Sequence, residues 1–150
     1  RPDMALFKFT KAILNREPID VYNHGDMKRD FTYIDDLVDA MRLLIDAIPH
    51  LALENKKNLN LFDSKSPVAP FRTVNIGNSK PQKLTDFIEE IERVVGIKAV
   101  KNLMPMQAGD VPATWADTSL LKALTGCNLE TGINEGVESF VQWYREYYKV

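Results

Sequence analysis

The sequence predicts an α/β fold, a small mixed arrangement of helices and short strands. Stretches with apolar residues at helical spacing alternate with short β-rich runs along the 150 residues. Hydrophobic residues make up 45% and charged residues 27%, as in an ordinary globular domain. No internal repeat or low-complexity segment interrupts the pattern, so one domain with its own core is expected.

In the first half of the chain the pattern predicts a helix, a hairpin and a second helix. Pro2 and Asp3 are favourable in the first turn of a helix over residues 2–15. Turn residues around His24 then join two β-rich runs, which predict a hairpin: 19–22 and 30–34. A second apolar stripe predicts a helix over 35–48, which Pro49 ends.

The second half begins with a polar, proline-bearing loop over 50–71. A short β-rich run at 72–77 precedes a helix for which Gly96 is a fitting C-terminal cap. The remaining predicted elements follow in order: a strand at 97–105, a loop at 106–117, a short helix to Leu124 capped by Asp117 or Thr118, and a last helix at about 134–148.

Charge and cysteine content narrow the class of protein. A net charge of -2 gives no electrostatic reason to expect nucleic acid or an anionic membrane as a partner. No apolar run approaches the ~20 residues of a membrane span. Cys127 is the only cysteine, so no intrachain disulfide forms, which fits a reducing compartment such as the cytoplasm.

Several catalytic and cofactor motifs are missing from the sequence. The seven glycines never form the G-x-G-x-x-G turn that lets a backbone approach a pyrophosphate. Neither a P-loop nor a G-x-S-x-G elbow occurs. His24 and His50 have no Cys or acid cluster at metal-ligand spacing, so no metal is expected. Any anion site must therefore be built from one or two well-placed cations.

Four segments together resemble one family over essentially the whole chain: "RPDMALFKFTKAI", "VYNHGDMKRDFTYIDDLVDA", "VNIGNSKPQKLTDFIEEIE" and "MQAGDVPATWADTSLL". In this order they resemble the C-terminal half of UDP-glucuronate 4-epimerases, in the extended short-chain dehydrogenase/reductase group. The resemblance implies a UDP-sugar-binding domain over 1–150, without the N-terminal Rossmann domain that binds NAD in the family.

The resemblance also assigns roles to individual residues. Arg29 resembles the Arg that contacts the UDP diphosphate, a role that suits its bidentate, always-charged fork. Val21 and Tyr22 resemble the strand that receives the uracil, and Asp110 resembles the acid that binds the ribose. Gln107 stands near the position where galactose-specific relatives carry a second diphosphate-binding Arg, so a neutral donor replaces that cation here.

Arg1, beside a helix start, is a candidate contact to the sugar or its carboxylate. The family's catalytic Tyr-x-x-x-Lys pair is not carried over, because none of the tyrosines in this sequence has a Lys four positions on. The implied parent is an NAD-dependent enzyme that interconverts UDP-glucuronate and UDP-galacturonate at C4, with a role in polysaccharide precursor synthesis. The isolated chain is expected to be inactive.

Other interpretations stay open at this point. From the residues alone, Arg29 would be a solvated Arg or a salt-bridge partner of Asp35 or Asp36. A UDP-glucuronate decarboxylase or dehydratase is the nearest enzymatic alternative. From a different class, the chain could be a non-catalytic UDP-sugar-binding or interaction module. An apolar surface facing the absent domain would favour self-association, so a homodimer is a candidate oligomeric state.

Overall fold

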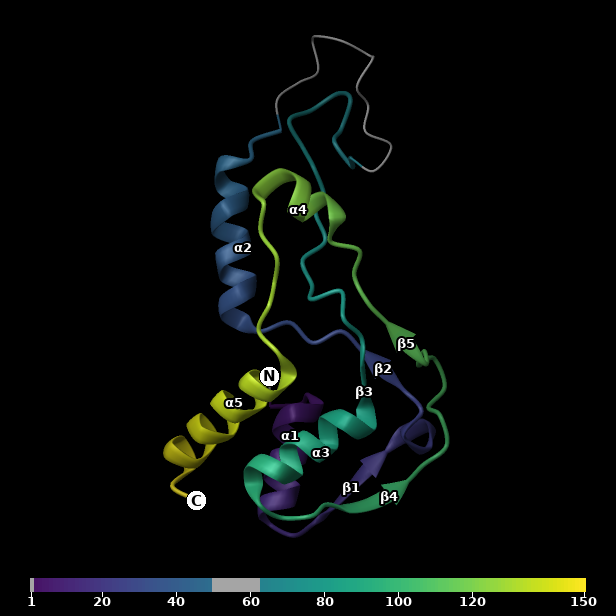
Figure 1. The fold of residues 1–150 in the computed structure, drawn as a ribbon. Helices are drawn as coiled ribbons and strands as arrows, with labels where there is room; N and C mark the ends of the chain where they lie inside the picture. Colours follow the sequence, from purple (N-terminus) through teal and green to yellow (C-terminus); the bar gives the residue numbers. More distant parts are fainter. Residues whose placement is uncertain (1, 50–62) are drawn as a thin grey trace. The chain divides into compact units, whose positions relative to one another are not determined.

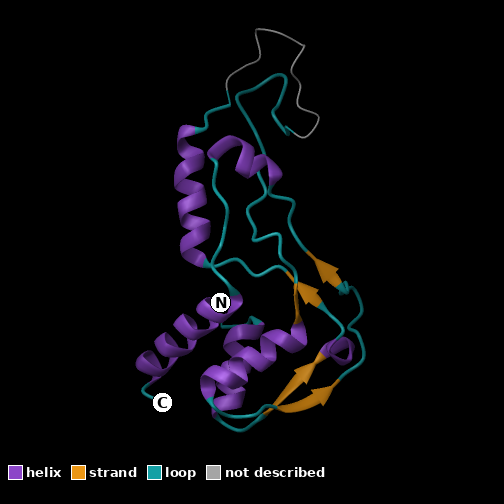
Figure 2. Cartoon of the chain, in the orientation of Figure 1, coloured by secondary structure: helices purple, strands orange, loops and turns teal. Residues whose placement is uncertain are grey.

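The computed structural model describes residues 2–49 and 63–150, which fall into two compact units. The first unit takes in the chain up to Phe31 together with Lys80–Thr114 and Thr131–Val150. The second comprises the described residues of Thr32–Ser79 and Trp115–Glu130. Helices dominate and the strands are short, so the predicted mixed α/β class is confirmed (Figures 1 and 2).

The elements of the first unit alternate between helix and strand. They are α1 (Ala5–Leu14), β1 (Pro18–Val21), the 3-10 turn η1 (Tyr22–Gly25), β2 (Lys28–Arg29), β3 (Gln82–Lys83), α3 (Leu84–Val95), β4 (Val100–Leu103), β5 (Ala113–Thr114) and α5 (Ile133–Tyr148). The helices keep the predicted order, whereas β5 lies in a segment that was expected to be loop.

The strands pair over long sequence distances. β1 runs parallel to β4, with Val21 opposite Leu103, and the two lie side by side in Figure 1. β2 lies between β3, which is antiparallel to it, and β5, which is parallel. The predicted hairpin of 19–22 with 30–34 is therefore wrong. Residues 30–33 form no strand, because left-handed backbone in η1 redirects the chain after β1.

The core of the first unit lies between its helices and β1. Its buried members are Ile13, Ile19, Val21, Phe87, Ile88, Ile91, Val95, Val137 and Val141. Phe31 stacks on Phe87 with ring centroids 4.4 Å apart, which fixes the segment after β2 against α3. Gly96 ends α3 in the left-handed conformation (φ 79°), as its position predicted.

The second unit consists of α2 (Ile34–Asp46), α4 (Ser119–Thr125) and extended chain. Ala40, Leu121 and Leu129 form its buried cluster. Thr118 is the N-cap of α4, and the Asp117 carboxylate accepts a hydrogen bond from the Ser119 N–H at 2.9 Å. Both predicted capping residues therefore contribute to this helix start.

Residues 72–77, predicted as a β-rich run, form no strand in the described part of the chain, although their apolar pattern is real. Val74 and Ile76 pack against the buried cluster of the second unit, but the segment pairs with no strand among the described residues. It therefore stays extended without a ladder. Of the predicted loop 50–71, residues 50–62 lie outside the described part. Residues 63–71 contain neither helix nor strand, and an ion pair of Asp63 with Arg72 (2.9 Å) holds them.

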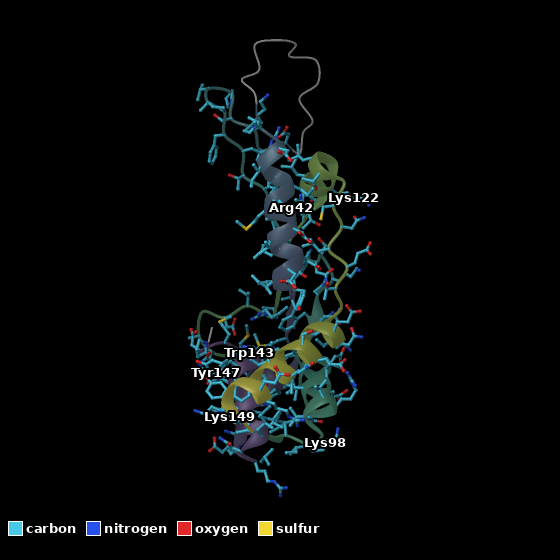
Figure 3. All side chains as sticks on the ribbon, turned by 90° about the vertical axis from the view of Figure 1, so that its left-hand side faces the viewer. Arg42, Lys98, Lys122, Trp143, Tyr147 and Lys149 are labelled. Carbon is cyan, nitrogen blue, oxygen red and sulfur yellow. The ribbon has the colours of Figure 1, made fainter. Side chains whose placement is uncertain are left out.

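Aromatic side chains gather on α5. Trp143 and Tyr147, both labelled in Figure 3, stack with ring centroids 5.4 Å apart and remain 44% and 66% exposed. These two rings pack along the helix surface rather than in the core. Among the described helices, none has the length and apolar character that a bilayer crossing requires.

Candidate functional site

A hollow of about 370 Å³ lies between α1 and β1 in the first unit. Its size falls within the range of small-molecule sites, about 300–1,000 Å³. Helix α1 lines it with a face that is mainly apolar, and β1 lines it with its first three residues. The lining residues are Asp3, Ala5, Lys8, Phe9, Ala12, Pro18, Ile19, Asp20 and Tyr22.

The backbone of β1 is open toward ligands along one edge. The Val21 carbonyl accepts a hydrogen bond from the Met104 N–H at 3.0 Å, so this group is bonded toward β4. Because a trans peptide is planar, the N–H of Tyr22 points the opposite way. The alternation of a parallel ladder likewise turns the Asp20 carbonyl away from β4. A donor and an acceptor thus lie together on the edge that β4 does not cover.

The sharp turn η1 places Tyr22 at the end of this edge. Asn23, His24 and Gly25 all have positive φ (50°, 52° and 88°), and the His24 N–H donates to the Met104 carbonyl at 3.0 Å. Gly25 is required here, because a Cβ would lie 3.1 Å from a methyl of Thr85 and φ is left-handed. His24 is a turn residue, as predicted.

Arg29 and Asp110 form an ion pair across 81 residues of sequence. Arg29 lies on the central strand of a small sheet, and Asp110 lies in the loop that leads into β5. The Arg29 Nη2 donates to Asp110 Oδ1 at 2.8 Å, and the two side chains are 29% and 33% exposed. The carboxylate partner of Arg29 is therefore Asp110. The roles assigned to these residues, diphosphate binding and ribose binding, did not predict a contact between them.

A tight turn fixes the direction of Asp110. Its N–H donates to the Gln107 carbonyl at 3.2 Å, and Gly109 between them has φ 85°. A hydrogen bond from residue i+3 to residue i, with positive φ at i+2, is typical of a type II turn, which favours Gly at that position. The backbone of Gln107 thus supports the site, while its side chain is exposed.

The structure brings together some of the residues with assigned roles. Arg29 and Asp110 are in direct contact, and Tyr22 lines the hollow. Val21 has a buried side chain (2% exposed) and a carbonyl bonded toward β4, so the polar groups that β1 offers to a ligand belong to its neighbours Asp20 and Tyr22. Arg1 lies outside the described residues. The roles themselves stay predictions.

Three features of the site were missed by the sequence analysis. Lys8 and Asp20 line the hollow, and Asn102 on β4 donates to the Asp20 carboxylate at 2.8 Å. The contact of Asp20 with Asn102 depends on the pairing of β1 with β4, for which the sequence carries no local signal. Within the described ranges, no group of His, Cys, Asp and Glu side chains could hold a metal ion.

Comparison with known proteins gives one family. A family model described as the NAD dependent epimerase/dehydratase family matches residues 1–77. The chain is 50% identical over 150 residues to the protein CapI of Staphylococcus aureus. It is 47% identical over 149 residues to a probable UDP-glucuronate 4-epimerase of Rhizobium meliloti. These alignments cover 99% of this chain but 44% and 43% of the relatives, so the chain spans less than half of their length.

Solved structures show the same likeness. The UDP-glucuronic acid 4-epimerase of Bacillus cereus, in complex with UDP-glucuronic acid and NAD, is 29% identical with a TM-score of 0.76. The match covers 99% of this chain and 41% of that one. A UDP-glucose 4-epimerase of Thermotoga maritima, 20% identical with a TM-score of 0.73, shows the likeness of fold alone.

Proposed function

The chain belongs to the NAD dependent epimerase/dehydratase family, and we propose that it is the UDP-sugar-binding part of a nucleotide-sugar epimerase. The proposed parent interconverts UDP-glucuronate and UDP-galacturonate at C4. The names of the Rhizobium meliloti relative and the Bacillus cereus structure support this choice of sugar. A cytoplasmic location is proposed with it, in line with the single cysteine, Cys127, which is free.

The open edge of β1 is the observation that carries the proposal. A uracil ring offers a carbonyl acceptor beside an N–H donor, and these match the Tyr22 N–H and the Asp20 carbonyl. The ring would bond to this edge as a residue of a neighbouring strand would. Apolar side chains of α1, including Phe9, give the ring a surface to pack on.

The charged groups of the same unit suit the rest of the ligand. The Arg29 guanidinium offers the planar fork that binds phosphate oxygens. The Asp110 carboxylate is an acceptor for ribose hydroxyls, and its ion pair with Arg29 keeps the two groups adjacent, as ribose and diphosphate are in a nucleotide. Arg1 and Gln107 remain proposed contacts to the sugar and the diphosphate.

The base-recognition proposal predicts discrimination between UDP and CDP. Cytosine presents an acceptor at N3 and a donor at N4, so it would set acceptor against the Asp20 carbonyl and donor against the Tyr22 N–H. We expect CDP to bind about 1–3 kcal/mol more weakly than UDP, the cost of groups left unpaired. Titration of the chain with each nucleotide, followed by NMR, measures the difference. Equal affinities for UDP and CDP would exclude the proposed contact between the base and this edge of β1.

NAD is proposed to be held by another part of the parent. The positive-φ glycines fit no dinucleotide cradle, because Gly96 and Gly126 end helices and Gly25 and Gly109 form turns away from a strand-to-helix junction. The residues described therefore do not fit the cofactor. We place the NAD-binding domain N-terminal to this chain in the parent.

The second unit presents a surface suited to that domain. One face of α2 and its C-terminal extension is apolar yet 54–72% exposed: Ile34, Val38, Met41, Ile45 and Ile48. The extended segment 72–77 has no strand beside it in the described residues. An exposed apolar stripe and an unpaired extended segment both indicate a missing partner. In isolation the same stripe favours self-association, and a homodimer through it is proposed for the chain alone.

Because NAD and the catalytic residues are proposed to lie in another part of the parent, we expect the chain by itself to have no epimerase activity. Neither a Tyr-x-x-x-Lys pair nor a dinucleotide turn is present in its sequence. Incubation with UDP-glucuronate and NAD should therefore give no UDP-galacturonate in a chromatographic assay, even when UDP binding is measurable. Product formed by the purified chain would contradict the proposed placement of the catalytic residues.

A further inference from the structure

The two oxygens of the Asp110 carboxylate have different surroundings. Oδ1 accepts hydrogen bonds from the Arg29 Nη2 at 2.8 Å and from the Val111 N–H at 2.9 Å. Oδ2 has no protein donor among the described residues, and the side chain is one-third exposed. One oxygen is thus committed to the protein, while the other is free to accept from a ligand.

Arg29 is held in place by hydrogen bonds that leave some of its N–H donors available to a ligand. Its Nη1 donates to the Lys28 carbonyl at 2.9 Å, and its Nη2 donates to Asp110. A guanidinium carries five N–H donors, so three remain for a ligand in the described structure. Both partners of Arg29 come from β2 and from the loop that enters β5, which pairs with β2. The guanidinium is therefore fixed by the sheet itself.

We infer that Asp110 is a positioning residue for Arg29, and that its carboxylate couples the ribose to the diphosphate. This inference rests on the proposed function. Oδ1 orients the guanidinium so that its free N–H groups face the phosphate oxygens, and Oδ2 accepts from a ribose hydroxyl. Asp110 thereby affects phosphate affinity as well as ribose affinity, although only the second role follows from its resemblance.

Two effects of the carboxylate oppose each other. Its negative charge weakens the attraction of Arg29 for phosphate, whereas its hydrogen bond removes conformational freedom from a long side chain before the ligand arrives. The charge effect is reduced by water, because both side chains are about one-third exposed. The loss of side-chain freedom is not screened. The orienting effect is therefore the larger one.

The test compares uridine with UDP on the whole chain. The ratio of the uridine Kd to the UDP Kd isolates the contribution of the phosphates, since effects on base and ribose cancel within each variant. Asp110→Ala is expected to lower this ratio about tenfold, in keeping with the strength of charge-assisted hydrogen bonds. Glu90→Ala, which breaks the Arg93–Glu90 pair (2.7 Å) on α3, is the matched control and should leave the ratio unchanged.

A second variant keeps the test independent of the first. Arg29→Lys retains the charge but loses the fork, so the ratio should fall, and adding Asp110→Ala to it should change nothing further. An unchanged ratio in Asp110→Ala would limit Asp110 to the ribose, and a raised ratio would mean that the carboxylate competes with phosphate. Either result overturns the inference alone. If the unsubstituted chain binds neither uridine nor UDP, the proposed function is overturned as well.

Discussion

Replacing Glu92 by glutamine is expected to lower the free energy of unfolding by about 3 kcal/mol at pH 7, because each unit by which folding lowers the pKa of this carboxyl corresponds to about 1.4 kcal/mol of stabilisation. The Glu92 side chain is 2% exposed, and its oxygens accept hydrogen bonds from Lys98 Nζ (2.7 Å), the Ala99 N–H (3.2 Å) and Lys101 Nζ (2.8 Å). Lys98, labelled in Figure 3, follows α3, and Lys101 lies on β4. The carboxylate thus fixes the turn that joins α3 to β4.

The effect has a defined pH dependence. Burial raises the pKa of Glu92, but the hydrogen bonds from Lys101, Lys98 and the Ala99 N–H lower it more, from 4.5 to about 2. A depressed pKa means that the stabilisation is complete above pH 4.5 and is lost as the pH falls toward 2. Glutamine does not titrate at this pH. The difference between the two proteins should therefore shrink steadily as the pH is lowered from 4.5.

Urea unfolding at pH 7 and at pH 3 measures both parts of this prediction. Glu90→Gln is the matched control, because Glu90 lies on the same helix and pairs with Arg93, whose side chain is 56% exposed. The Glu90 side chain is more exposed than that of Glu92 (17% against 2%), so losing its pair with Arg93 is expected to cost about 1 kcal/mol at most. A Glu92→Gln protein as stable as the control at pH 7, or a stability difference that does not shrink at low pH, would show that the buried carboxylate is not what fixes this turn.

The helices could be predicted from the sequence because their signals are local. Apolar spacing and terminal residues such as Gly96 and Thr118 act within a few positions, and the structure keeps them. The strands depend on partners far away in the chain. β1 finds β4 some eighty residues later, and β2 needs both β3 and β5, so two β-rich runs close in sequence gave a false hairpin.

The site divides in the same way. The motifs around Arg29 and Asp110 predicted that one side chain binds the diphosphate and the other the ribose of a nucleotide. The contact between the two side chains was not predicted, because it exists only through the pairing of β2 with β5. The hollow needs α1 and β1 together, and its donor–acceptor edge follows from the ladder with β4. At 72–77 the pattern of a strand was present, yet a strand requires a neighbour that the described residues do not supply.

Arg29→Ala is expected to weaken binding of UDP to the chain by about 1.5–3 kcal/mol, the range for hydrogen bonds to charged groups. The guanidinium is only partly exposed and already oriented by Asp110, so phosphate binding costs little further ordering. Uridine, which lacks phosphates, should lose almost nothing. Calorimetric or NMR titration with both ligands gives the two numbers.

Lys28→Ala is the control that tests position rather than charge. Lys28 is the other residue of β2, and successive side chains on a strand point to opposite faces. The Lys28→Ala substitution therefore removes one positive charge, as Arg29→Ala does, but on the face away from Asp110. Long-range attraction alone would lower UDP affinity similarly in both variants, and by less in high salt. A loss confined to Arg29→Ala that persists in salt identifies a direct contact. If Arg29→Ala and the unsubstituted chain bind UDP with equal affinity, Arg29 is excluded from the site.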